Sequence, residues 1–149
     1  MRPDTPKVLM GIAGTLATQV LPEIQTPIAM QSVTLSAAML SMVAQEFDRA
    51  ASRLVEENRA VRALLKDARP VIADASLHGR IDAETSDLTE HDFHVGALQA
   101  VNDRLRELLI DVHACIESTP GPDAANLNER IWDELKESTR RRHLVSGLA

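Results

Sequence analysis

The chain has 149 residues, with 16 Lys or Arg and 22 Asp or Glu, so its net charge at pH 7 is −6. This length suits a single domain over residues 1–149 with a substantial core. The acidic balance argues against nucleic acid as a main partner, because phosphate binding needs a basic surface. Aromatic residues make up only 2% of the chain, which predicts an aliphatic core. The single cysteine allows no internal disulfide, which is typical of a cytoplasmic protein.

The first predicted helix covers about residues 5–21, and Thr5 is placed to cap its N-terminus. Its uncharged stretch after Lys7 also has some character of a signal peptide. However, Asp4 lies where such a peptide would be basic, and no small-x-small cleavage motif follows. We therefore interpret this stretch as the first helix of the domain.

The longest predicted helix covers residues 27–69, which contain no glycine and no internal proline, and Pro70 ends it. Its first part carries no charge as far as Gln45, which predicts burial on several sides. A membrane span is the competing interpretation. Because polar residues interrupt the run and no continuous 18-residue apolar stretch exists, we expect no membrane partner.

The second part of this helix carries a heptad seam, in which buried positions alternate steps of three and four residues. The seam consists of Leu40, Val43, Phe47, Ala50, Leu54, Glu57, Val61, Leu64 and Ala68. Glu57 is its only polar member, and a buried carboxylate is costly unless it is paired or hydrated. It is expected either to line a small polar pocket or to pair with an arginine such as Arg104 or Arg106.

Residues 77–88 are predicted to form an acidic loop, and a third helix is predicted from Thr89. This helix repeats the seam pattern through His91, His94, Leu98, Val101, Leu105, Leu108, Val112 and Cys115. The two seams are natural partners, so we expect the second and third helices to pack antiparallel. The predicted core residues are Phe47, Leu54, Val61, Leu98, Leu105 and Leu108.

A fourth helix is predicted over about residues 123–145, after a break at Pro120-Gly121-Pro122. Leu127, Ile131, Leu135 and Trp132 are expected to face inward. The arginines at 140–142 suit the negative end of the helix dipole, with anion binding as an alternative. The predicted fold is all-α, a four-helix up-and-down bundle with one very long second helix.

Two histidines are the candidate metal ligands. His91 and His94 lie three residues apart on one helix face, and Glu57 on the facing seam completes a possible divalent-metal set. The alternative is that the seam simply frays into solvent there. No histidine has a glutamate three residues before it, which excludes the ferritin-like di-iron pattern. No catalytic signature or cofactor motif is present, and we expect no cofactor.

Residues 19–50 resemble part of a small bacterial all-helical family of unknown function. The likeness rests on the Val20-Leu21-Pro22-Glu23-Ile24 turn and on a following alanine-rich helix that contains Ala29, Leu35, Ala37, Leu40, Val43, Ala44, Glu46 and Phe47. It covers about a third of the chain and transfers no site residue. Members are often encoded beside acyl-CoA dehydrogenases and aminoglycoside-phosphotransferase-like proteins, so the resemblance implies a bacterial accessory protein.

The sequence therefore predicts a helical interaction protein without catalytic activity of its own. Between Val8 and Gln45 the only charged residue is Glu23, so the first two helices present uncharged surface on nearly every side. A second copy of the same surface is the simplest cover, and we expect a homodimer to which Met30, Val33, Ala37 and Leu40 contribute. A different protein partner is the alternative cover. The alternative function is small-ligand or divalent-metal binding in a pocket between the second and third helices.

Overall fold

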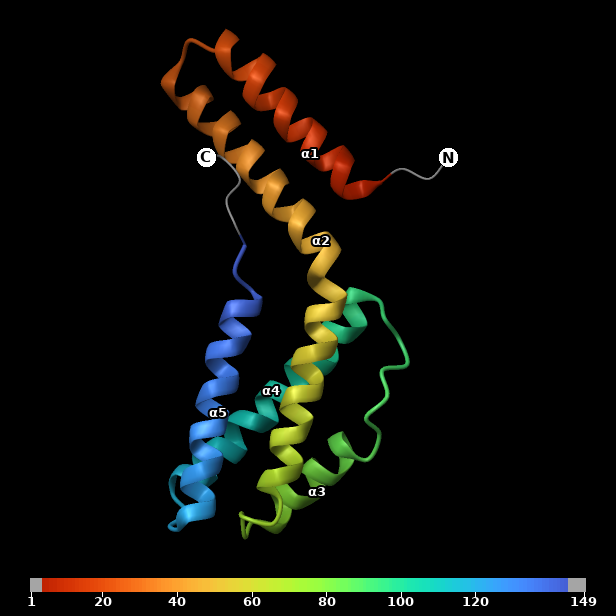
Figure 1. Ribbon diagram of the computed structural model, residues 1–149, viewed down its shortest axis with the longest axis vertical. Helices are drawn as coiled ribbons and strands as arrows, with labels where there is room; N and C mark the ends of the chain where they lie inside the picture. The colour runs from red at the N-terminus through yellow and green to blue at the C-terminus, as the bar shows by residue number, and fades with distance from the viewer. Residues whose placement is uncertain (1–3, 145–149) are drawn as a thin grey trace. The chain divides into compact units, whose positions relative to one another are not determined.

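The computed structural model describes residues 4–144, and all regular secondary structure in this range is helical (Figure 1). In chain order the elements are α1 (Thr5–Thr15), the π-helical turn η1 (Leu16–Val20), the 3₁₀ turn η2 (Leu21–Glu23), α2 (Pro27–Ala68), α3 (Ala75–Thr85), α4 (Val95–Glu117) and α5 (Pro122–Arg141). The all-α class and the very long second helix are confirmed. The predicted count of four helices differs from the five α-helices of the described range.

The chain divides into two compact units, and α2 contributes to both. The first, which we call the hairpin unit, contains the described residues 4–50 and 143–144. The second, the core unit, spans Ala51–Arg142. That residues 1–149 form a single domain stays a prediction.

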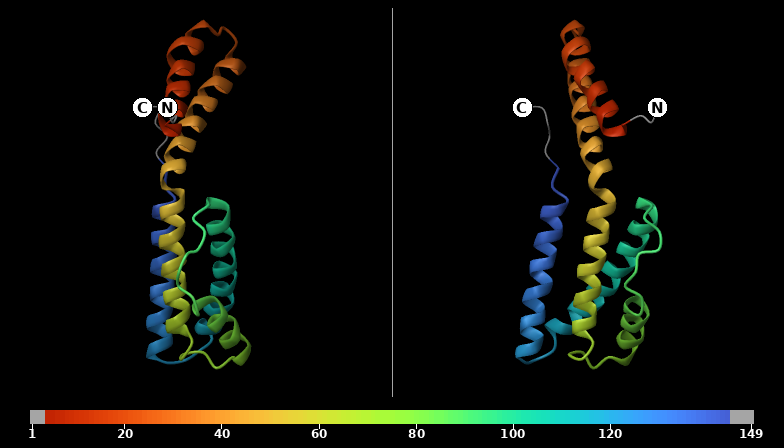
Figure 2. Two further views of the ribbon diagram at one scale, coloured as in Figure 1. Left: turned by 90° about the vertical axis from the view of Figure 1, so that its right-hand side faces the viewer. Right: turned by 45° about the vertical axis from the view of Figure 1, so that its right-hand side comes forward.

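The hairpin unit is built from α1 and the N-terminal part of α2, which lie side by side in opposite directions (Figures 1 and 2). Helix α1 is capped by Asp4, not Thr5, because the Asp4 carboxylate accepts a hydrogen bond from the Lys7 backbone N–H at 3.3 Å. The buried residues of its helices include Ala13, Ala37 and Ala44, which are small. Small side chains of this kind allow two helices to approach closely.

The core unit encloses an aliphatic cluster, as its low aromatic content predicts. Four helical segments supply it, namely residues 51–68 of α2 with α3, α4 and α5, together with Ile72 between α2 and α3. Its members are Val61, Leu64, Leu65, Ala68, Ile72, Leu77, Ile81, Leu105, Leu108, Leu109, Val112, Ile116, Ala124, Leu127 and Ile131. Five of the six predicted core residues are buried, namely Leu54, Val61, Leu98, Leu105 and Leu108. The prediction for the sixth residue, Phe47, is wrong, because its side chain is 60% exposed.

Consecutive segments of the core unit alternate in direction. Side-chain contacts pair the end of α2 with α3 through Arg69 and Asp82 at 2.6 Å, and α3 with α4 through Arg80 and Asp111 at 2.6 Å. Because α3 reverses the chain between them, α2 and α4 run in the same direction in this unit (Figure 1). The predicted antiparallel packing of these two helices is therefore wrong.

Helix α3 occupies most of the stretch predicted as a loop. Asp74 caps it, and its carboxylate accepts hydrogen bonds from the backbone N–H groups of Ser76 and Leu77 at 2.8 and 3.3 Å. Leu77 and Ile81 lie four residues apart and are both buried, so this short helix has one apolar face. Gly79 and Asp82, two of the residues that suggested a loop, lie on its exposed side.

The later helices also begin and end differently from the predictions. Helix α4 begins at Val95, so His91 and His94 precede it and do not belong to a buried seam. Trp132 is 48% exposed and not inward-facing, and its ring meets that of His113 edge-on at 5.4 Å. Helix α5 ends at Arg141, and the predicted end at Val145 lies outside the described residues.

The helical state of α3 can be tested at Gly79. Because a Cβ added there meets nothing within 4 Å, Gly79→Ala should raise the free energy of unfolding by about 0.5–1 kcal/mol, the helix-interior preference for alanine. The matched control is Gly121→Ala, which should be destabilising because Gly121 has φ 124°. Denaturant unfolding of both variants measures this, and a neutral or destabilising Gly79→Ala would contradict a helix there.

The core position of Leu105 gives a second test. Its side chain is 0% exposed, so Leu105→Ala should lower the free energy of unfolding by about 2–5 kcal/mol. Ile110→Ala on the same helix is the matched control, because Ile110 is 70% exposed and its truncation should change stability little. A loss below about 0.5 kcal/mol for Leu105→Ala in denaturant melts would place that residue outside the core.

Candidate functional site: the buried Glu57 network

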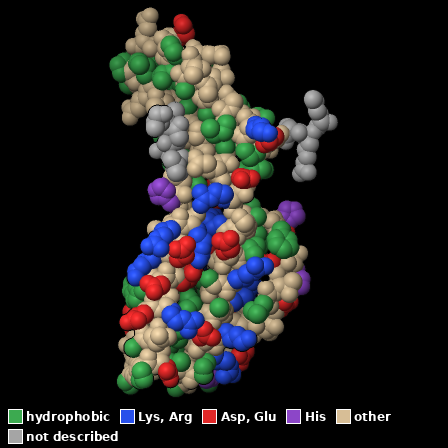
Figure 3. Space-filling view, viewed as in Figure 1, with side chains coloured by type: hydrophobic (Ala, Val, Ile, Leu, Met, Phe, Trp, Pro, Cys, Tyr) green, Lys and Arg blue, Asp and Glu red, His purple; other side chains and the backbone are tan. Residues whose placement is uncertain are grey.

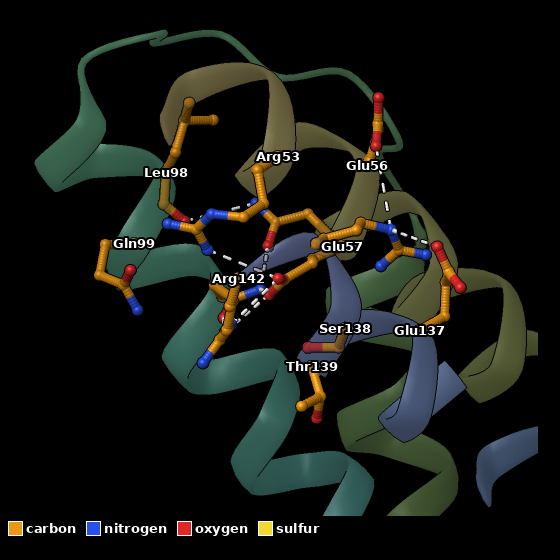
Figure 4. Close-up of polar contacts among 12 residues, drawn as sticks. Arg53, Glu56, Glu57, Leu98, Gln99, Glu137, Ser138, Thr139 and Arg142 are labelled. Carbon is orange, nitrogen blue, oxygen red and sulfur yellow. Dashed lines mark hydrogen bonds and ion pairs between the residues drawn. The ribbon is translucent and has the colours of Figure 1, made fainter. Parts of the chain in front are cut away.

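Glu57 lies in α2 with 0% of its side chain exposed, and its carboxylate is surrounded by arginine and amide donors (Figure 4). Arg142, at the end of α5, donates from Nε to Oε1 at 3.1 Å and from Nη2 to Oε2 at 2.7 Å. Arg106 of α4 donates from Nη2 to Oε2 at 3.0 Å. This two-point contact with Arg142 is the bidentate geometry in which a guanidinium matches a carboxylate best.

Two further donors complete the shell around this carboxylate. Arg53, one turn before Glu57 on α2, donates to Oε1 at 3.4 Å, and Asn102 of α4 donates to Oε2 at 3.4 Å. Asn102 also donates to the Asn58 side chain at 3.0 Å. Three helices therefore meet at one buried polar cluster, and each carboxylate oxygen accepts more than one hydrogen bond.

A second buried ion pair continues the network into the segment before α4. The Glu90 carboxylate accepts from Arg62 Nη1 at 2.5 Å and from Asn58 Nδ2 at 3.3 Å. The side chains of Arg62 and Glu90 are only 7% and 6% exposed. Asn58 also donates to the backbone carbonyl of Leu98 at 3.3 Å, so it connects the Glu90 carboxylate with the start of α4 and, through Asn102, is linked to Glu57.

The charge balance around Glu57 sets its protonation state. Burial raises the pKa of this carboxyl, but the hydrogen bonds and positive charges of Arg142 and Arg106 lower it by more. The resulting pKa is about 2, against an ordinary value of 4.5. A carboxylate that is ionised at neutral pH and bonded on both oxygens is a poor general base. The chemistry of the cluster is therefore that of a structural ion network.

These contacts decide between the two expectations for Glu57, an arginine partner or a small polar pocket. Of the two suggested arginine partners, Arg106 does pair with it, whereas Arg104 contacts Glu84 at 3.3 Å. The alternative of a small polar pocket receives no support here, because the polar groups bond to one another. Arg142 was not assigned to Glu57 from sequence, because it lies 85 positions away and its only sequence signal was its place among three arginines.

The three candidate metal ligands are not brought together. The imidazole of His91 contacts Asp87 at 2.7 Å, that of His94 contacts Asp92 at 2.5 Å, and both rings are exposed. The hydrogen bond from His91, with those from Thr89, lowers the pKa of Asp87 to about 2. Among residues 4–144, no cluster of three or more His, Cys, Asp or Glu side chains is arranged to hold a metal ion.

The arginines at 140–142 contact carboxylates of the core unit. Arg140 lies 3.3 Å from Glu137, and Arg141 contacts Glu134 at 2.8 Å in a two-point pair. Arg142 is the main partner of Glu57. The contacts of Arg140 and Arg141 with Glu137 and Glu134 lie within α5, whereas Arg142 attaches the end of α5 to α2.

Comparisons with protein-family models, with curated proteins and with solved structures found no match. Any function must therefore be argued from the residues and contacts of this chain.

The Glu57 network predicts a pH dependence of stability. Because the folded pKa of about 2 lies below the ordinary 4.5, the unfolded chain binds more protons between these values, and stability rises with pH there. The contribution, roughly 3 kcal/mol, is fully present above about pH 4.5 and is lost as pH falls through 2. Urea melts of the wild type across this range measure it.

Glu57→Gln isolates that contribution. It should lower the free energy of unfolding at pH 7 by about 3 kcal/mol, because it removes the charge that pairs with Arg106 and Arg142, and it should flatten the pH profile between 2 and 4.5. Glu56→Gln is the matched control, since the Glu56 side chain is 65% exposed. Equal stability of Glu57→Gln and the wild type at pH 7 would refute the assigned role.

Proposed function

We propose that this chain is a helical interaction protein, without catalytic activity of its own, that forms a homodimer through its hairpin unit. The observation that carries the proposal is an inverted distribution of side-chain sizes on α2. Ala37 and Ala44 are buried, whereas Leu35 and Met39 are 59% and 56% exposed. Residues two apart point to roughly opposite sides of a helix, so the large side chains form a separate outer face.

This outer face, which we call the outer seam, consists of Ile28, Leu35, Met39 and Val43. They follow one another at seven, four and four residues, the spacing of one helix face, and each is at least 52% exposed. The predicted interface residues fall differently. Met30 is 41% exposed, but Ala37 is only 1% exposed and is covered within the chain, so it is replaced in the proposed interface.

The hydroxyl groups of the hairpin unit add little polarity to this surface. Ser32, Thr34 and Ser36 each donate to the backbone carbonyl four residues earlier, at 2.8–3.0 Å. Thr15 and Thr18 of the other helical arm do the same at 3.1 and 2.8 Å. A hydroxyl that donates to its own helix can be covered by another surface without losing its hydrogen bond.

The apolar surface is also large enough for a specific interface. Ten large hydrophobic side chains are exposed in residues 4–50, against five in the longer core unit. At roughly half exposure each, the ten present on the order of 800–900 Å² over all faces of the hairpin unit, and one partner contributes about 800 Å² to a standard interface. Figure 3 shows the same contrast on one face, where charged side chains crowd the core unit and are scarce on the hairpin unit.

A second copy is the occupant that this surface favours. An uncharged surface can face itself without like-charge repulsion, and two-fold dimers are the commonest assembly. A membrane is the competing cover, because α2 is long and apolar enough to cross one by composition and only 17% of its most apolar window is buried. Gln25, just before α2, and Gln31 of α2 are also exposed, and their amides suit a protein contact better than lipid.

The core unit acts as a four-helix up-and-down bundle that carries the interaction hairpin, and the protein works in the cytoplasm. The resemblance of residues 19–50 supports an accessory role in bacterial metabolism. A ligand or metal pocket between α2 and α4 is less favoured, because the polar groups there bond one another.

Self-association can be measured directly. Sedimentation of the wild type at tens of micromolar should give twice the chain mass, and the double variant Leu35→Glu with Met39→Glu should be monomeric and soluble. The physical reason is that two carboxylates buried at a two-fold contact face like charges without a partner. The control is Ile110→Glu, which places a charge on an even more exposed apolar residue of the core unit and should leave the dimer intact.

The same samples test the other occupants. Flotation with anionic and neutral lipid vesicles should leave the wild type unbound. A soluble wild-type monomer, a dimer unaffected by the double variant, or a monomer that floats with vesicles would each overturn the proposed dimer.

A further inference from the structure

A hollow of about 300 Å³ lies on the core unit, between one face of α2 and the segment that precedes α4. Its lining consists of Arg59, Arg62, Ala63, Lys66 and Leu88. The volume is at the lower end of the range for small-molecule sites. The lining combines three cationic side chains with apolar surface and contains no acidic residue.

The spacing of the α2 residues explains the hollow. Arg59, Ala63 and Lys66 follow one another at four and three residues, so they lie along one face of the helix. The alanine in the middle has no side chain beyond Cβ, which leaves space between the two long flanking side chains. Leu88 closes one side of this space and is 53% exposed, so its apolar surface is available to a bound molecule.

Two of the three positive charges at the hollow, those of Arg59 and Lys66, are not neutralised within the described residues. Arg59 and Lys66 form no ion pair in the part of the chain that the structure describes, and both are exposed. Arg62 is buried and held in place by Glu90 at 2.5 Å and by the backbone carbonyl of Glu84 at 3.3 Å. These bonds use Nη1 and Nε, and Nη2 makes no hydrogen bond within residues 4–144.

The neighbouring carboxylates are committed to other partners. Glu84 contacts Arg104 at 3.3 Å, Asp87 contacts His91 at 2.7 Å, and Asp67 contacts Arg130 at 2.6 Å. The hollow is thus a place where positive charge exceeds negative charge beside an apolar wall. This combination fits a ligand that has both an anionic group and a hydrocarbon body.

We propose that the hollow binds a small amphipathic anion, with its carboxylate or phosphate between Arg59 and Lys66 and its apolar body against Ala63 and Leu88. Arg62, fixed by Glu90, supplies a positioned donor at the floor. This site is separate from the dimer surface of the hairpin unit. It gives the chain a ligand-binding capacity that does not depend on self-association.

Calorimetric titration of the full chain with octanoate tests the proposal. We expect saturable binding of one molecule per chain, with octanamide at least about tenfold weaker because it lacks the charge. Acetate and inorganic phosphate should also bind at least about tenfold more weakly, because they lack the apolar body. Octyl phosphate tests whether carboxylate or phosphate is the preferred anionic group, and saturable binding of either supports the site.

Variants locate the binding. Arg59→Gln and Lys66→Gln should each weaken octanoate binding about fivefold, and Ala63→Leu should abolish it by filling the hollow while keeping a good helix former. Lys136→Gln removes the same charge from an exposed position on α5 and should leave the affinity unchanged. The Leu35→Glu and Met39→Glu variant should also bind normally, which separates the hollow from the apolar hairpin.

Three results would overturn the site: no saturable binding of octanoate or octyl phosphate, equal affinity for octanamide, or affinity unaffected by Arg59→Gln, Lys66→Gln and Ala63→Leu. Circular dichroism of each variant confirms that a loss of binding does not reflect unfolding.

Discussion

The arrangement of the core unit depends on the burial of one carboxylate. Glu57 has no exposure to water, so its charge is tolerable only where donors surround it. Those donors come from different helices, Arg106 and Asn102 from α4 and Arg142 from α5. A rotation or a one-turn slip of either helix would separate the donors from the acceptor. The network therefore selects one packing among the many that a uniform aliphatic core would allow.

The two parts of α2 obey different rules. Beyond residue 50 the helix buries a charged residue and compensates it with a shell of donors from its neighbours. Before Gln45 it has no charge at all, and its buried side chains are small while its large ones face outward. Beyond residue 50, polar contacts determine which side chains of the neighbouring helices pack against α2. Before Gln45 there are no charged contacts of this kind, so the packing of the helix depends on the shape and apolar area of its side chains.

The sequence predicted most of the fold where a single strong local signal existed. The bounds of α2 follow from Pro27, Pro70 and the absence of glycine between them, and the seam positions Leu54, Val61 and Leu105 are buried as their spacing predicts. Helix α3 was missed because Gly79 and acidic residues outweighed a short apolar pair. That omission alone produced the wrong direction for α4, since one additional helix reverses the chain.

The candidate site was only partly predictable for a similar reason. A carboxylate in a buried seam indicates that a positively charged or hydrogen-bonding partner is needed, but the identity of that partner depends on tertiary contacts. Arg106 could be predicted as a partner because it lies on the helix expected to pack against α2. Arg142 could not, because the turn at Gly121 and the length of α5 bring it to Glu57. The prediction that His91 and His94 belong to a buried seam was wrong because α4 begins at Val95, after both of them.

The contact between Trp132 and His113 gives the protein a built-in optical probe. Trp132 is the only tryptophan, and there is no tyrosine, so tryptophan fluorescence reports on the packing of α4 against α5. Far-ultraviolet ellipticity, in contrast, sums over every helix. A thermal scan that records both signals would separate melting of the hairpin, which changes only the ellipticity, from melting of the core unit, which changes both.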